Sequence, residues 1–262
     1  MSDAKLLDGK VAIVTGIGPG MGRSIALLFA SHGAEVVLAA RSQDYLAKVA
    51  DEIAAVGREP LAVPTDISDA GQCDRLVDAT IERFGGVDVF VQNGHHPRDW
   101  KAVTDAEPAD WRQIMEVNFW GAFTISRRVI PSMTARGGGR IVLVNSGAAL
   151  RNPPTMGAYA ASKAALASLA RTLANEVGHS GILVNSLTLG PVQGENQFQV
   201  FADDMDRTEA ERVLDEKGRG LPLGRMPTPD ECAGSVLYLA SPLSAAVTGQ
   251  NIVVNGGQWV TV

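Results

Sequence analysis

Residue types that would define several other classes of protein are scarce in this chain. Its 262 residues contain two cysteines and four histidines. Cys73 and Cys232 are too few for a disulfide framework or a cysteine metal site, and the histidines lack metal-ligand spacing. We therefore expect no metal centre.

Long apolar runs and clusters of basic residues are also missing. No apolar run is long enough to cross a membrane, and the polar start Met-Ser-Asp-Ala-Lys lacks a signal-peptide core. The net charge is −6 and no basic run stands out, which argues against a nucleic-acid partner. The sequence therefore predicts a cytoplasmic protein that binds neither nucleic acid nor membrane.

What is present is a regular alternation of strand and helix patterns. With 45% hydrophobic residues, the chain can bury the core of a single α/β domain over residues 1–262. The alternation predicts a Rossmann fold: a doubly wound, seven-stranded parallel sheet in the order 3-2-1-4-5-6-7 with helices on both faces. The expected strands lie at 10–15, 35–40, 60–63, 87–92, 141–144, 181–188 and within 248–257. The expected helices lie at 25–30, 44–57, 69–84, 108–135, 157–177 and 229–240.

A tyrosine and a lysine lie four residues apart on the expected helix 157–177. Tyr159 and Lys163 therefore share one face, one helical turn apart. A nearby ammonium favours the phenolate, so such a tyrosine can exchange a proton with an alcohol oxygen. Ser146, at a strand end, could hydrogen-bond the same oxygen. The alternative is a surface pair on an ordinary helix.

A glycine-rich turn joins the first strand to the first helix. It contains Gly16, Gly18, Gly20 and Gly22 with Met21 between the last two. Glycines let the backbone approach a pyrophosphate, and the helix N-terminus favours its charge. A tight turn without a ligand is the alternative.

The end of the second strand bears on the choice of dinucleotide. An acid there would bind the ribose 2′-hydroxyl of NAD, but the chain has Ala40 followed by Arg41 and Ser42. Arg41 could bind the 2′-phosphate of NADP. We therefore expect NADP(H), with NAD(H) as a possible cofactor and a solvated Arg41 as the alternative.

Together these motifs resemble the short-chain dehydrogenase/reductase family. The Thr15-Gly16-x-x-x-Gly20-x-Gly22 spacing, the Tyr-x-x-x-Lys pair and the preceding serine all match. The resemblance runs from about residue 10 to residue 257 and implies a catalytic tetrad of Asn118, Ser146, Tyr159 and Lys163. In the family, the asparagine bends its helix locally and supports a proton relay.

The resemblance also implies the residues that contact the cofactor. Asp66 would bind the adenine amino group, and Val192 the nicotinamide carboxamide. The full set is Gly16, Gly18, Gly20, Met21, Gly22, Arg41, Ser42, Asp66, Ile67, Asn93, Tyr159, Lys163, Gly190 and Val192.

Several positions depart from the family pattern. The segment Gln92-Asn93-Gly94-His95 replaces Asn-Asn-Ala-Gly, so a histidine stands where the family has glycine. Leu189 replaces a proline, Gly194 a threonine, and Asn255 an aspartate. The changes at 92–95, 189 and 194 lie in segments that are expected to run past the cofactor.

The substrate is the least defined part of the prediction. An acid-rich segment at about 194–220 is expected to form a lid over the cleft, or else a plain surface helix. The side chains expected to contact substrate are His95, Trp100, Met156, Phe198 and Phe201. Their types suggest a hydrophobic or cyclic ketone or secondary alcohol, with an exposed polar loop as the alternative for His95.

The resulting hypothesis is an NADP(H)-dependent oxidoreductase that interconverts a ketone and a secondary alcohol. The family resemblance further implies self-association as a homotetramer, or a dimer. Two alternatives stay open: a catalytically silent NADP(H) sensor of the same fold, and a structural or nucleic-acid-binding module that binds no cofactor.

Overall fold

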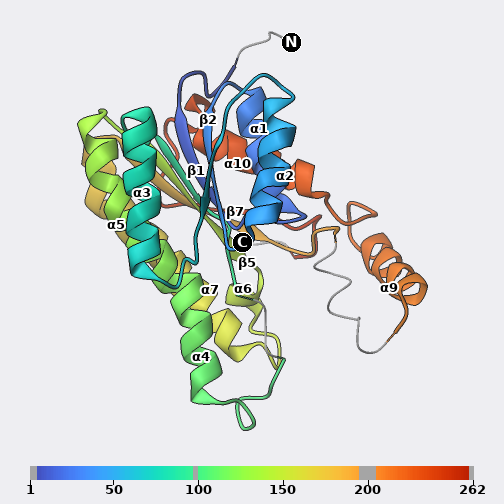
Figure 1. Ribbon diagram of the computed structural model, residues 1–262. Coiled ribbons are helices and arrows are strands. Elements are labelled where there is room, and N and C mark those ends of the chain that lie inside the picture. Colours follow the sequence, from blue (N-terminus) through green and yellow to red (C-terminus); the bar gives the residue numbers. More distant parts are fainter. Residues whose placement is uncertain (1–4, 97–99, 195–204, 260–262) are drawn as a thin grey trace.

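Seven apolar segments form one parallel sheet at the centre of the molecule (Figure 1). The computed structural model describes residues 5–96, 100–194 and 205–259. The strand order is β3-β2-β1-β4-β5-β6-β7, which confirms the predicted topology. The strands are β1 Val11–Thr15, β2 Glu35–Ala40, β3 Leu61–Pro64, β4 Val89–Gln92, β5 Gly139–Ser146, β6 Ile182–Leu189 and β7 Asn251–Val254.

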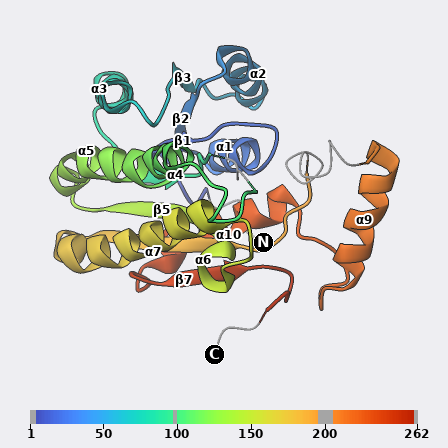
Figure 2. The same ribbon diagram turned by 90° about the horizontal axis from the view of Figure 1, so that it is seen from below.

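Helices cover both faces of the sheet (Figure 2). Helices α1, α2 and α10 pack on one face, and α3, α5 and α7 on the other. Side chains of a strand alternate between the two cores: Ala12 and Val14 face the first, whereas Ile13 faces the second. The helices are α1 Met21–Ser31, α2 Gln43–Ala54, α3 Ala70–Phe84, α5 Gly121–Ala135, α7 Gly157–Val177 and α10 Pro229–Ala240.

Polar side chains fix where several of these helices begin. Ser42 caps α2 and Asp69 caps α3 by accepting bonds from backbone N–H groups of the first turn. Thr228 and Glu231 form a reciprocal capping box at α10. Helix α1 is different, because Gly20 precedes it without a side-chain cap and its first turn holds no acidic residue. The N–H groups at its start are therefore not used by a capping side chain.

The expected long helix at 108–135 is interrupted. Helix α4 (Pro108–Met115) passes into a π-helical turn at Glu116–Trp120, and α5 then continues to Ala135. The π turn contains Asn118, so the helix departs from regular α geometry at the residue for which a local bend was expected.

Smaller elements lie beyond the carboxyl ends of the strands. The short helix α6 (Ala148–Arg151) occupies part of what was expected to be a loop. Helix α9 (Arg207–Arg219) lies in the expected lid and stands away from the sheet in both views (Figures 1 and 2). Short 3-10 turns occur at Gly178–Ser180 and Pro242–Ser244. Within the described ranges, no helix is both long and apolar enough to span a membrane.

Candidate active site

The predicted site lies at one edge of the sheet. Thr15, Gln92, Ser146 and Leu189 are the last residues of β1, β4, β5 and β6, and these parallel strands all end at this edge. The strand order reverses between β1 and β4. In open α/β sheets, ligands bind in the crevice at such a reversal.

Tyr159 and Lys163 lie in the first two turns of α7 and are both buried, with 8% and 3% of their surface exposed. Lys163 Nζ lies 5.8 Å from the centroid of the Tyr159 ring. The structure therefore excludes the alternative of an ordinary solvated surface pair.

The lysine is held from the sheet side. Its Nζ donates a hydrogen bond to the carbonyl oxygen of Val144 at 3.0 Å. Burial lowers the pKa of Lys163 from 10.5 to about 8. The ammonium form still predominates at neutral pH, so a positive charge lies beside the Tyr159 ring.

Ser146 ends β5 and leads into α6. Its hydroxyl oxygen accepts a bond from Ala148 N at 3.2 Å, and its own N–H donates to Asn145 Oδ1 at 2.9 Å. The side-chain amide of Asn145 in turn donates to the carbonyl oxygen of Lys163 at 3.0 Å. Asn145 therefore ties the strand that ends in Ser146 to the helix that carries Tyr159 and Lys163. Asn145 was not among the predicted site residues, although a polar residue inside an apolar strand was a signal.

Asn118 is fully buried in the π turn and joins two other segments. Its Oδ1 accepts a bond from the backbone N–H of His96 at 2.7 Å. Its Nδ2 donates to Ser162 Oγ at 2.9 Å, and Ser162 Oγ donates to the Tyr159 carbonyl oxygen at 2.8 Å. The predicted tetrad is thus connected through Ser162 and Asn145, two residues that the prediction did not include.

The four glycines of the turn serve two purposes. Gly16 has a positive φ of 70°, and a Cβ there would lie 2.9 Å from the Asn93 carbonyl carbon. A Cβ on Gly22 would lie 2.9 Å from the Gly16 carbonyl carbon. A Cβ on Gly18 or Gly20 would have no atom of the described residues within 4 Å. The outer pair is therefore required by chain packing, whereas the inner pair borders open space at the start of α1.

The segment that departs from the family pattern has its own support. Thr15 Oγ1 donates to Gln92 Oε1 at 2.9 Å, and Gln92 Nε2 donates to the carbonyl oxygen of Gly94 at 3.0 Å. Asn93 Nδ2 donates to the Gly16 carbonyl oxygen at 2.9 Å. His95 is not among the described non-glycine residues with positive φ, so it does not need a glycine conformation. The segment is fixed to the glycine turn by hydrogen bonds that the sequence did not reveal.

Three of the predicted cofactor residues follow β2 and β3, and Asp66 among them is half-buried. Arg41 is exposed, and Ser42 uses its hydroxyl to cap α2. Asp66 Oδ1 accepts bonds from Ser68 Oγ at 2.6 Å and Ser68 N at 3.0 Å. These bonds, and secondarily the charge of Arg41, lower the pKa of Asp66. The Asp66 carboxylate therefore uses Oδ1 for hydrogen bonds within its own turn. Arg41 lies close enough for its positive charge to lower the pKa of Asp66.

The segment that follows β6 packs against the end of β7 and the turn after it. Gly190 N donates to the Val254 carbonyl oxygen at 2.9 Å, and a Cβ on Gly190 would lie 2.6 Å from Asn255 Cβ. Val192 follows and is half-buried. Glycine is therefore required at 190 by its contact with Asn255.

The predicted substrate residues are only partly brought together. The His95 ring meets the Tyr159 ring edge-on, with centroids 6.4 Å apart, and Met156 is buried in a cluster with Tyr159. Trp100 is 45% exposed and has a positive φ of 52°. Phe198 and Phe201 lie outside the described residues.

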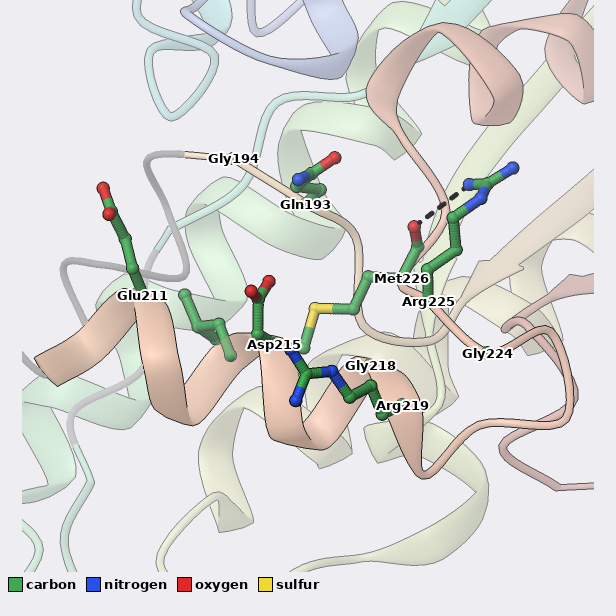
Figure 3. Close-up of a pocket in the computed structure, with 10 residues that line it drawn as sticks. Gln193, Gly194, Glu211, Asp215, Gly218, Arg219, Gly224, Arg225 and Met226 are labelled. Atoms are coloured by element: carbon green, nitrogen blue, oxygen red, sulfur yellow. Dashed lines mark hydrogen bonds between the residues drawn. The ribbon is translucent and has the colours of Figure 1, made fainter. Parts of the chain in front are cut away.

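A cavity of ≈ 390 Å³ lies against α9 in the expected lid region (Figure 3). Asp215 points from α9 toward Gln193 and Met226 in Figure 3. None of the four tetrad residues lines this cavity, and much of its lining is charged. The lining residues are Gln193, Gly194, Glu211, Leu214, Asp215, Gly218, Arg219, Gly224, Arg225 and Met226.

Comparison with known proteins identifies the family. A family model described as enoyl-(acyl carrier protein) reductase matches residues 16–258. The chain is 34% identical to 7α-hydroxysteroid dehydrogenase of Escherichia coli K12, over 98% of this chain and 96% of that protein. L-Sorbose reductase from Gluconobacter frateurii, complexed with NADPH and L-sorbose, matches with a TM-score of 0.92 and 29% identity, covering 99% of this chain and 100% of that one. A 7α-hydroxysteroid dehydrogenase complexed with NADH and 7-oxo glycochenodeoxycholic acid matches with a TM-score of 0.87 and 34% identity, covering 98% and 97%.

These matches span nearly the whole chain and agree with the fold. The protein is an oxidoreductase with a Rossmann fold. It belongs to the short-chain dehydrogenase/reductase family.

Proposed function

We propose that the protein is an NADP(H)-dependent oxidoreductase that interconverts a ketone and a secondary alcohol. Hydride would pass between the nicotinamide and the carbonyl carbon of the ketone, which becomes the carbinol carbon of the alcohol. The observation that carries this proposal is the buried Tyr159–Lys163 pair beside the strand end at Ser146. The description of the family model names enoyl reduction. The Tyr-x-x-x-Lys spacing favours carbonyl chemistry instead, because enoyl reductases of the family have a longer spacing.

Each tetrad residue then has a distinct task. Tyr159 donates its phenolic proton to the carbonyl oxygen in reduction and accepts it back in oxidation. The ammonium of Lys163 favours the phenolate, which lowers the pKa of a tyrosine. Ser146 hydrogen-bonds and polarises the carbonyl oxygen. Asn118 holds the π turn against α7 and supports the proton relay.

The chain has the features needed to hold the cofactor. Gly18 and Gly20 border open space where a pyrophosphate can approach the uncapped start of α1. Asn93 follows β4 and is bonded to Gly16 after β1, so it lies at the sheet's reversal point, and it is assigned as a ribose contact. Val192 follows β6 on the β4 side of that point and is assigned as a nicotinamide contact. Asp66 and Ile67 are assigned to the adenine end, and Gly190 to the nicotinamide end.

The preference for NADP(H) rests on Arg41. Its exposed guanidinium follows β2, where no acid is available to bind a 2′-hydroxyl. The related structures differ in their cofactor, since one contains NADPH and another contains NADH. Arg41→Ala should raise KM for NADPH by about 10-fold or more, the size of a lost charge-assisted bond, and leave KM for NADH nearly unchanged. Arg75→Ala, an exposed arginine on α3, is the matched control. A wild type that prefers NADH would overturn the assignment.

The substrate class is proposed as a hydrophobic or cyclic ketone. Met156 and His95 lie against Tyr159, so one apolar and one polar side chain border the reacting centre. Of the relatives, one structure contains L-sorbose and another an oxo bile acid. A panel of acyclic, cyclic and steroid ketones would define the range.

The decisive experiment is NADPH oxidation with that panel, comparing wild type with Tyr159→Phe. Loss of the general acid should lower kcat by roughly 10²–10⁴-fold. Tyr238→Phe removes a hydroxyl from an exposed tyrosine on α10 and should keep full activity. NADPH binding measured by fluorescence titration should survive in both variants. Binding without turnover on any ketone would instead favour a cofactor sensor.

We further propose a homotetramer, or a dimer, assembled through α5 and α7. Trp120 is 46% exposed at the start of α5 and meets Phe119 and Phe123 at centroid distances of 5.1 and 5.6 Å. Such an aromatic group at a helix surface suits burial by a partner. Trp120→Asp should shift the mass measured by light scattering toward the monomer.

A further inference from the structure

The turn after β7 reaches back to the strand end that carries Ser146. The Trp259 ring lies against Gly147, the residue that follows Ser146. A Cβ on Gly147 would lie 2.7 Å from Trp259 Cζ2, and its three nearest atoms all belong to the Trp259 ring. The guanidinium of Arg151 lies 5.5 Å from the centroid of the same ring. Because Gly147 precedes α6 and Arg151 ends it, the indole contacts both ends of this helix.

The turn that carries Trp259 is itself fixed. Asn255 Nδ2 donates to the Trp259 carbonyl oxygen at 2.8 Å, and Asn255 Oδ1 accepts from Gly257 N at 2.9 Å. The other side of Asn255 packs on Gly190, as described above. One buried amide therefore holds Trp259 in place and also forms a packing surface for the segment after β6.

The contact bears on the orientation of the serine hydroxyl. Ser146 Oγ accepts a bond from Ala148 N, the first N–H of α6. Gly147 N donates to the Leu189 carbonyl oxygen at 2.8 Å. A shift of α6 would therefore move both the donor to the serine hydroxyl and the connection to β6.

We propose that Trp259 is a positioning residue, whose ring holds α6 at the end of β5 and so fixes the Ser146 hydroxyl toward the carbonyl substrate. This inference rests on the proposed ketone reductase function. It assigns the turn after β7 a role in the chemical step.

The ring, and not a hydrogen bond, is responsible. Trp259 Nε1 is buried and has no hydrogen-bond partner among the described residues. Trp259→Phe therefore loses no bond and keeps an aromatic ring over Gly147, although a smaller one. It should retain more activity than Trp259→Ala.

A size exchange tests the contact directly. Gly147 has φ −57° and ψ −18°, a conformation that alanine adopts without strain. Gly147→Ala should therefore lower kcat only through the clash with Trp259. The double variant Gly147→Ala, Trp259→Ala should recover activity relative to Gly147→Ala alone. Gly178→Ala is the matched control, because Gly178 has φ −57° and a Cβ there would have no described residue within 4 Å.

The measurements are kcat and KM for a ketone, with Kd for NADPH. Trp259→Ala should lower kcat by about 10-fold or more, since small misplacements of reacting groups are costly. Kd for NADPH should stay within about twofold, because the tested contact touches none of the proposed cofactor residues. Gln258→Ala, an exposed neighbour in the same turn, should behave as wild type. Unchanged kcat in Trp259→Ala, or no recovery in the double variant, would overturn the inference.

Amide hydrogen exchange gives a readout that needs no turnover. Residues 146–151 should exchange faster in Trp259→Ala than in wild type, and slower in Trp259→Phe than in Trp259→Ala. If the wild type reduces no ketone, the proposed function fails and this measurement alone decides the inference. If amide hydrogen exchange of residues 146–151 is the same in Trp259→Ala and wild type, the positioning role of Trp259 is refuted.

Discussion

The side-chain amide of Asn118 donates a hydrogen bond to Ser162 Oγ at 2.9 Å. Both side chains are fully buried, and the bond joins the π turn to α7. The same asparagine also accepts a bond from the backbone of His96. One side chain therefore connects three segments around Tyr159.

Ser162→Ala should destabilise the protein measurably. It leaves the Asn118 amide with a buried, unsatisfied N–H, which costs about 1–3 kcal/mol. Urea unfolding followed by circular dichroism measures the loss. Ser126→Ala on α5 is the matched control, because its buried hydroxyl has no hydrogen-bond partner in the described part of the chain. Equal stability of the two variants would show that the bond contributes nothing.

Much of the fold was predictable because it depends on local pattern and simple topology. The strands are short apolar runs, and parallel strands joined by helices leave few possible orders. The placement of Tyr159 and Lys163 on one helical face follows from their spacing alone. The predicted sheet order was correct for these reasons.

The contacts that hold the site together could not be predicted in the same way. Asn145, Ser162 and Gln92 find their partners in segments distant in sequence or in backbone groups that no pattern marks. The π turn at Asn118 adds one residue to a turn, which hydrophobic periodicity does not resolve. The approach of Trp259 to Gly147 is likewise a meeting of distant segments.

Gly16 and Gly94 should respond differently to alanine. Gly16 combines φ 70° with close backbone neighbours, so Gly16→Ala should abolish NADPH binding or folding. A Cβ on Gly94 would lie 2.9 Å from Ile67 Cδ1, a side-chain end that can move, and 3.4 Å from Gly16 N. Gly94→Ala should therefore fold and bind NADPH within a fewfold of wild type by fluorescence titration. An equal loss of NADPH binding in Gly16→Ala and Gly94→Ala would contradict the inference that the Ile67 side chain can move aside.

Asp88 should stabilise the edge of the sheet where β1 and β4 begin, opposite the edge that carries the active site. Its buried carboxylate accepts bonds from Arg136 Nη2 at 2.8 Å and Val11 N at 3.0 Å. Burial opposes ionisation, but the bonds to Arg136 and Val11, with the charge of Lys10, leave the pKa of Asp88 below its usual 3.8. Asp88→Asn should cost about 1–3 kcal/mol at neutral pH.

The effect of Asp88 should disappear in acid. A depressed folded-state pKa gives stability that is present above 3.8 and lost as the pH falls through the folded value. Denaturant unfolding measured from pH 7 downward should show a constant difference between wild type and Asp88→Asn well above pH 3.8, and a shrinking difference below it. Asp78→Asn, at an exposed ion pair on α3, should show a much smaller difference at pH 7.

Lys163 should make stability depend on alkaline pH. Burial lowers its pKa to about 8 in the folded protein, against 10.5 for an exposed lysine. Between these values the unfolded chain binds more protons than the folded one, so unfolding free energy should rise with pH. The destabilising effect of the buried charge is fully present below about pH 8 and is relieved as the pH rises above it. Lys163→Met removes the titrating group and should lack this rise.

The comparison requires urea unfolding of wild type and Lys163→Met between pH 7 and pH 10. The variant should be the more stable protein at pH 7, and the difference should shrink toward pH 10. Lys48→Met, which removes an exposed lysine on α2, controls for the change in net charge. If wild type and Lys163→Met keep a constant difference over this range, the ammonium of Lys163 is not destabilised by burial. The charge beside Tyr159 would then persist well above pH 8, and ketone reduction would keep its lysine-dependent rate there.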